Sequence, residues 1–191
     1  MRRYRVAAGF SFVELLIVLV LMTIVAAMVI PNSNPNIVSQ LSSAAQVLQS
    51  DLAYCQSLSV THNSTFHIQF NGGSDEYYLE HTGTDTTLNA LPNSIYGDSP
   101  NGTRRTMRFS DHPHTGAGVR VEQVQTISSP STTVTGVEFG PLGGTARTEG
   151  TAIWLTAGQS TTQRYLPVYI DATTGLTRVG EVVAIPSVNS F

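Results

Sequence analysis

The most constraining feature of the sequence is an apolar run near its N-terminus. The 21 residues from Phe10 to Ile30 contain one charged side chain, that of Glu14. At a rise of about 1.5 Å per residue, a helix of this length spans roughly 32 Å, close to the hydrocarbon thickness of a bilayer. The run therefore predicts one membrane-spanning helix over residues 10–30.

The segment ahead of this run sets the predicted orientation. Residues 1–9 carry three arginines, Arg2, Arg3 and Arg5. Positive charges of this kind mark the cytoplasmic end of a membrane helix. We therefore expect a single-pass protein with a cytoplasmic N-terminus, whose remaining residues lie outside the inner membrane.

An ordinary secretory signal is the alternative for the same segment. Such a signal has a shorter apolar core followed by small residues at the cleavage site, and Ala26 and Ala27 weakly fit that pattern. The run nevertheless stays apolar to Ile30, and Glu14 has no use in a signal core. A lone carboxylate is costly in lipid and is usually functional. A Glu14 that stays hydrated near the interface is the simpler alternative.

Residues 9–31, GFSFVELLIVLVLMTIVAAMVIP, resemble the signal of type IV prepilins and pseudopilins. The resemblance implies that a prepilin peptidase cuts after Gly9, which makes residues 1–9 a cleaved leader. It implies that the new N-terminal residue, Phe10, is N-methylated, and that Pro31 kinks the helix. It also implies partners: other pilins or pseudopilins in a filament, and an inner-membrane assembly platform.

The chemistry of Glu14 fits such an assembly. Cleavage would leave a cationic amine on Phe10, and N-methylation would keep its charge. If neighbouring helices are staggered, the Glu14 carboxylate of one subunit can meet the amine of the next. Opposite charges in a poor solvent attract strongly, and leaving either alone is expensive. We therefore expect Glu14 to set the register of subunits in a filament.

A second, amphipathic helix is expected within residues 31–63. Pro31 lacks an amide hydrogen and breaks the first helix, and Asn34 is the predicted N-cap of the next, with Pro35 in its first turn. The helix should run to about His62 and end near Asn63. Its apolar residues recur in steps of three and four, which marks one helical face: Ile37, Leu41, Ala44, Ala45, Leu48, Leu52, Cys55 and Leu58. The opposite face would hold Ser43, Gln46 and Gln49.

Residues 64–191 are expected to form a β-rich extracytoplasmic head. Short runs of alternating apolar residues, separated by turn residues, are typical of strands. The expected strands are 65–70, 77–81, 105–109, 119–126, 134–139, 152–155, 164–170 and 177–184. Asn71-Gly72-Gly73 would join the first two as a hairpin, and 82–102 and 128–133 would be exposed loops. The predicted fold class is α+β, with a long N-terminal helix packed on an antiparallel sheet, as in pilins.

The C-terminal half resembles one branch of this superfamily. Phe139, Pro141, Gly143, Gly175 and Arg178 lie in a pattern similar to that of the H-type minor pseudopilins, the GspH/FimT family. The resemblance implies a minor pseudopilin of a type II secretion system, a structural subunit of the periplasmic pseudopilus used in protein export. A minor pilin of a type IV pilus, serving adhesion, motility or DNA uptake, is the alternative. Some FimT-type relatives bind DNA through arginines near this C-terminal turn, where this chain has only Arg178.

Composition and motifs argue against other classes of function. From residue 10 onward, seven arginines face thirteen acidic side chains, so nucleic acid is an unlikely partner. The sequence has no nucleophile elbow, phosphate-binding loop or zinc-protease motif, and we expect neither an enzyme nor a cofactor. A secreted enzyme on a plain anchor would need such a constellation. A carbohydrate- or peptide-binding head on a pilin stays open.

The sequence contains a few side chains that could form a reactive or metal site. His112 and His114 could share a metal ion, but no further ligand cluster accompanies them, and we expect no metal site. Asp171 begins what looks like an ordinary tight turn. Cys55 is the single cysteine, so no internal disulfide can form, and we expect it to be buried on the second helix.

One basic cluster interrupts the head. It consists of Arg104, Arg105 and Arg108, of which the last two lie on the expected strand 105–109. The simplest interpretation is a solvated strand edge that discourages aggregation. The functional alternative is a contact with another pilin or with DNA.

Overall fold

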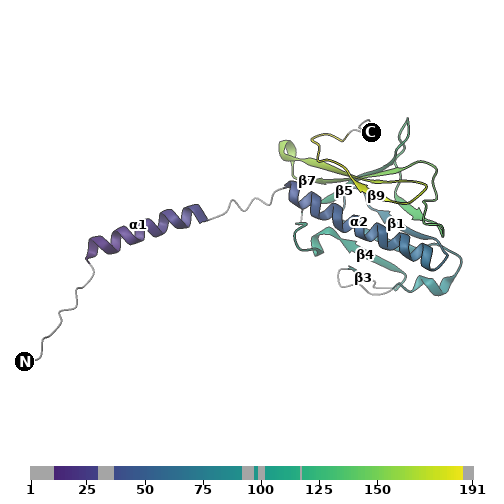
Figure 1. The fold of residues 1–191 in the computed structure, drawn as a ribbon, viewed down its shortest axis with the longest axis horizontal. Coiled ribbons are helices and arrows are strands. Elements are labelled where there is room, and N and C mark those ends of the chain that lie inside the picture. The colour runs from purple at the N-terminus through teal and green to yellow at the C-terminus, as the bar shows by residue number, and fades with distance from the viewer. Residues whose placement is uncertain (1–10, 30–36, 92–96, 99–101, 117, 187–191) are drawn as a thin grey trace, which may run out of the picture. The chain divides into compact units, whose positions relative to one another are not determined.

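The computed structural model describes residues 11–29, 37–91, 97–98, 102–116 and 118–186. Tertiary contacts divide the chain into two compact units, Met1–Asn34 and Pro35–Phe191. Figure 1 shows both units.

Within its described residues, 11–29, the N-terminal unit forms the helix α1, Phe12–Val29. Its large apolar side chains are exposed from Phe12 to Ile24, and even mid-helix residues such as Leu19 keep more than half of their surface in solvent, 59% for Leu19. A helix that is apolar on all sides is stable only when lipid or protein covers it. The partner of α1 must therefore come from outside its own unit.

The second unit begins with α2, Ile37–Thr61. This confirms the second predicted helix, while its predicted cap at Asn34 and Pro35 lies outside the described residues. The buried face consists of Leu41, Ala44, Ala45, Leu48, Leu52, Cys55 and Ser59. Gln46 is exposed as expected, but Gln49 is half-buried. Its amide donates to the carbonyl of Thr177 at 3.1 Å, because this flank of the helix adjoins the last strand.

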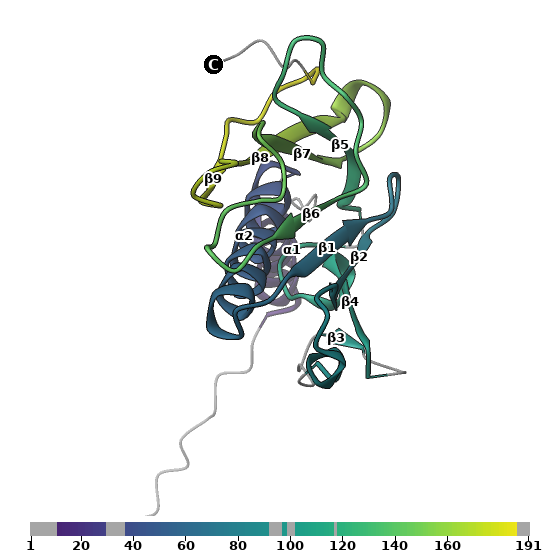
Figure 2. The same ribbon diagram turned by 90° about the vertical axis from the view of Figure 1, so that its right-hand side faces the viewer.

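Two antiparallel sheets flank α2, where the sequence had suggested one. The five-stranded sheet has the order β3-β4-β2-β1-β6, and the four-stranded sheet the order β5-β7-β8-β9. The first comprises β1 (Phe66–Phe70), β2 (Glu76–His81), β3 (Gly97–Asp98), β4 (Arg104–Arg108) and β6 (Gly136–Phe139). The second comprises β5 (Arg120–Thr126), β7 (Thr151–Ala157), β8 (Arg164–Ile170) and β9 (Thr177–Val179). Figure 2 shows α2 alongside both sheets, and its residues contact strands of each.

The core lies where α2 meets these sheets. In β1, Phe66, Ile68 and Phe70 point inward and are buried, while the residues between them face outward. This period of two is the expected signature of a sheet with one covered face. Burying one such large apolar side chain stabilises the fold by about 1.5–3 kcal/mol. The predicted α+β class is confirmed.

The β1–β2 hairpin is also confirmed. Phe66 pairs with His81 and Phe70 with Tyr77. The connection needs a left-handed residue, and Gly73 supplies it with φ +79°, a conformation that costs glycine little.

β7 differs from the other strands because all seven of its residues are buried. It lies between β5 and β8 in the centre of its sheet. Ile153 and Leu155 join the main core, and Trp154, with 2% of its surface exposed, lies on the opposite face. A strand that is covered on both faces has a continuous run of apolar residues instead of alternating apolar and polar residues. This explains why the expected strand covered only residues 152–155.

Two predicted boundaries were wrong. The segment 82–102, expected as an exposed loop, contains the 3₁₀ helix Thr86–Asn89 and the two-residue strand β3, and Leu91 is buried. The last strand, expected over 177–184, ends at Val179. Beyond it, only Val183 forms an isolated bridge, with Tyr165. Short 3₁₀ helices also follow β4 (Phe109–Asp111) and β7 (Ser160–Thr162).

Candidate functional site

The N-terminal motif is the first candidate site, and only part of it is described. Gly9, Phe10 and Pro31 lie outside the described residues. Glu14 lies in the first turn of α1, where an acidic side chain complements the helix dipole, and it is exposed. Its carboxylate is thus available to a cation on another molecule. The cleavage, methylation, assembly and kink roles of these four residues stay predictions.

Over the residues that the structure describes, no helix meets the length and hydropathy of a membrane span.

The C-terminal pattern forms a single structural unit at the distal third of α2. The side-chain amide of Gln56 donates to the carbonyl of Gly143 and to that of Thr174, each at 2.7 Å. A Cβ on Gly175 would come within 2.1 Å of the Gly143 carbonyl oxygen. Both glycines have positive φ, +85° for Gly143 and +67° for Gly175. Sequence reasoning found the two glycine turns but missed Gln56, the polar residue that joins them.

Asp171 forms the tight turn expected for it. Its carboxylate accepts hydrogen bonds from the backbone N–H groups of Thr173 (3.1 Å) and Thr174 (2.8 Å) and from the Thr174 hydroxyl (2.8 Å). The bonds from Thr174 hold the pKa of this carboxyl below its usual value. Asp171 therefore remains charged, with its lone pairs directed into its own turn.

The arginine cluster of β4 does not form a solvated edge. β4 lies between β3 and β2, and its arginines divide between the two faces of the sheet. Arg104 pairs with Glu80 at 2.7 Å and Arg108 with Glu76 at 3.2 Å on the outer face. The guanidinium carbon of Arg105 lies 5.1 Å from the centre of the Tyr54 ring, a residue of α2. The expectation failed because sequence position could not reveal the flanking strands.

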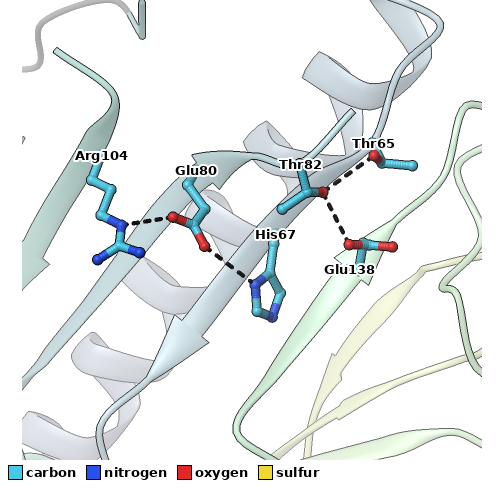
Figure 3. Close-up of polar contacts among 6 residues, drawn as sticks. All are labelled: Thr65, His67, Glu80, Thr82, Arg104 and Glu138. Carbon is cyan, nitrogen blue, oxygen red and sulfur yellow. Dashed lines mark hydrogen bonds and ion pairs between the residues drawn. The ribbon is translucent and has the colours of Figure 1, made fainter. Parts of the chain in front are cut away.

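Figure 3 shows how the outer face of the five-stranded sheet continues this pairing. Glu80 contacts both Arg104 and, at 3.8 Å, His67, while Thr82 donates to Glu138 at 3.0 Å. These residues come from four adjacent strands or their ends, so the row crosses the sheet. Partial burial lowers the pKa of His67, against the opposing effect of Glu138 and Glu80.

A buried polar pair joins the same sheet to α2. The Tyr77 hydroxyl donates to Asp51 at 2.5 Å. Burial raises the pKa of Asp51, and the Tyr77 hydrogen bond and Arg105 oppose that rise. Sequence reasoning missed this pair, although Asp51 is the one charged residue of an otherwise neutral helix.

The remaining candidates do not form a reactive centre. Cys55 is buried on α2 as expected, and burial raises the pKa of its thiol well above the ordinary value. Among the described residues, no group of three or more histidine, cysteine and acidic side chains is placed to hold a metal ion. His112 and His114 are therefore not part of such a group.

Known proteins resemble this chain in its N-terminal motif and in its fold. Residues 4–30 match the prokaryotic N-terminal methylation motif. No curated protein matches the sequence. Two crystal forms of the type IV minor pilin FimU from Pseudomonas aeruginosa strain PAO1 are similar in structure. One has a TM-score of 0.43 and 18% identity over 74% of this chain and 93% of FimU. The other has a TM-score of 0.43 and 15% identity over 76% and 88%.

The motif match spans Gly9, Phe10 and Glu14, the residues on which the predicted processing depends. The match therefore identifies residues 4–30 as a prokaryotic N-terminal methylation motif.

Proposed function

We propose that this chain is a structural subunit of a filament, specifically a minor pseudopilin of a type II secretion system. Its head would be periplasmic, α1 would anchor it in the inner membrane, and the pseudopilus would be its working form. One observation carries the proposal: Glu14 lies alone in a 21-residue apolar run, four residues after the expected new N-terminus at Phe10. The similarity of the Phe139-to-Arg178 region to H-type minor pseudopilins supports the finer assignment.

The exposure of α1 supports an anchoring and packing role. Its apolar side chains are unprotected within its own unit. Lipid can cover them before assembly, and neighbouring helices can cover them afterwards. The full run of residues 10–30 extends past the described helix at both ends, and its length matches a bilayer.

Glu14 would give this packing its register. After cleavage, the amine of Phe10 and the carboxylate of Glu14 are the only charges in the apolar segment of each subunit. In a medium of low dielectric constant, an unpaired charge is strongly disfavoured, and a pair is favoured when its geometry is good. Only a stagger that brings the two groups together would satisfy both.

The test uses a chemical property of this chain. The sequence contains no lysine, so the mature N-terminus would be its only amine. A zero-length carbodiimide reagent applied to intact filaments should therefore join the Phe10 amine only to a carboxylate beside it. Mass spectrometry should find a methylated N-terminus at Phe10 and cross-links that involve Glu14 or the Phe10 amine of this chain.

Variants provide the functional readout. Glu14→Ala should abolish incorporation into filaments, whereas Thr23→Ala, a matched change on the exposed surface of α1, should not. Normal incorporation of Glu14→Ala, or a mature chain that retains its arginine-bearing leader, would refute the proposal. Loss of protein secretion on deletion supports the pseudopilus; loss of surface pili with secretion intact would assign the chain to a type IV pilus instead.

A further inference from the structure

A cavity of about 670 Å³ opens at one end of the four-stranded sheet. β5 and β8 end there, and β7 and β9 begin there, so the lining comes from Ile127, Gly150 and the β8–β9 hairpin. Ile127 and Leu176 provide apolar surface, and Tyr169, Thr177 and Arg178 provide polar groups. A site of this size that combines apolar walls with a few polar groups is typical of a binding pocket.

Arg178 differs from every other arginine of the head. Arg104, Arg108 and Arg120 form ion pairs with glutamates, Arg147 and Arg164 donate to backbone carbonyls, and Arg105 lies over an aromatic ring. Arg178 forms no ion pair, hydrogen bond or ring contact with a described residue, although its charge acts on the nearby Tyr169 hydroxyl and opposes the rise of the Tyr169 pKa. Its guanidinium, with five donors in a planar fork, is thus available to a ligand.

The backbone beneath Arg178 is well fixed. β9 pairs with β8, so that Arg178 lies opposite Tyr169. On the other edge of β9, the carbonyl of Thr177 accepts a hydrogen bond from Gln49 of α2. Figure 2 shows β9 beside β8 at the edge of this sheet. A cation carried on a rigid strand loses little backbone freedom when a ligand binds.

The rim of the cavity limits the charge that a ligand can carry. Asp171 also lines it, and its carboxylate is occupied by the N–H and hydroxyl groups of its own turn. From residue 37 onward, seven arginines face twelve acidic side chains. Arg178 can pair with a single carboxylate. The net negative charge of the head would repel a polyanion such as nucleic acid at long range.

The apolar wall adds a second requirement. Leu176 is 66% exposed beside Arg178, and Ile127 lies across the cavity. An aliphatic group next to the bound carboxylate would cover these side chains. From this geometry we infer that the cavity binds an acidic segment of a partner protein, with a glutamate or aspartate side chain on Arg178 and a neighbouring aliphatic side chain on Leu176. This inference goes beyond the filament role and does not depend on it.

The test measures binding of one defined probe to the full chain in detergent micelles. The probe is a fluorescently labelled Leu-Glu-Leu peptide with blocked termini, followed by fluorescence anisotropy. Arg178→Gln should weaken binding by about 10-fold or more, the usual effect of losing a hydrogen bond to a charged group. Arg120→Gln is the matched control because it removes the same charge from β5, at the opposite edge of the sheet, and should leave binding within about 2-fold.

Two further measurements keep the inference falsifiable if a variant fails to fold. A Leu-Gln-Leu peptide tested on the unaltered protein should lose affinity by the same factor as Arg178→Gln. Leu176→Ser should also weaken binding of Leu-Glu-Leu. The inference is overturned if the glutamine peptide binds equally well, or if no saturable binding occurs at millimolar peptide. Displacement of the peptide by inorganic phosphate or single-stranded DNA at equal concentration would overturn it too. None of these outcomes bears on the processing of Phe10 or the role of Glu14.

Discussion

α1 and α2 each contain one charged residue, and the two acids lie in opposite environments. Glu14 of α1 is exposed, whereas Asp51 of α2 is half-buried and accepts a hydrogen bond from Tyr77. The apolar side chains follow the same division, since those of α1 are exposed and one face of α2 is buried against two sheets. The partners of α2 thus lie within the head, whereas the described side chains of α1 are not covered within their own unit.

The largest expected effect contrasts a leucine from each helix. Leu48→Ala should lower the free energy of unfolding of the head by about 2–5 kcal/mol, because Leu48 is fully buried and its removal leaves a cavity. Leu19→Ala on α1 should change it by no more than about 0.5 kcal/mol. Urea unfolding of the full chain in detergent can be followed by the fluorescence of Trp154, the sole tryptophan. Equal effects of the two changes would remove the contrast between the helices.

The next effect concerns the acid of α2. Tyr77→Phe should destabilise the head by about 1.5–3 kcal/mol, because it removes a hydrogen bond to a half-buried carboxylate. Tyr78→Phe is the matched control, since the Tyr78 ring lies under Arg104 on the outer face of the sheet. The same unfolding measurement should separate the two variants. A control that costs as much as Tyr77→Phe would show that the pair has no special role.

A smaller effect is expected where α2 meets the glycine turns. Gln56→Ala should cost about 1–2 kcal/mol, because it removes two hydrogen bonds to the carbonyls of Gly143 and Thr174. Gln46→Ala, on the exposed face of the same helix, should be close to neutral. Hydrogen exchange should show faster opening of the 171–176 turn in the first variant only. Unchanged protection in that turn would contradict the proposed connection.

The smallest effect is a change in pH dependence. Burial raises the pKa of Asp51 in the folded state. At a pH between the ordinary pKa, near 3.9, and this raised pKa, Asp51 is protonated in the folded state but ionised in the unfolded state. In that window, Asp51 contributes a loss of stability as the pH rises. Asp51→Asn should remove this loss, by at most about 1.4 kcal/mol per pH unit. As the pH rises above about 4, stability should therefore increase more in the variant than in the unaltered protein.

Much of the architecture could be predicted from local pattern. The spacing of Leu41, Leu48 and Leu52 marked the buried face of α2, and alternation located β1, β2 and β8 within a residue. β7 was underestimated because both of its faces are buried, which removes the alternation. β9 was overestimated because Val183 resembles strand sequence although it forms only one isolated bridge.

The sequence by itself determined the N-terminal motif, the apolar run of α1 and the inward face of α2. These features depend on neighbours a few residues apart, since helix and strand geometry fix where each side chain points. Only the tertiary structure decided that there are two sheets, that Gln56 joins turns 87 and 118 residues away, and that Arg178 lies opposite Tyr169. Pairings of polar groups over such separations depend on how the whole chain packs, and local periodicity carries no record of them.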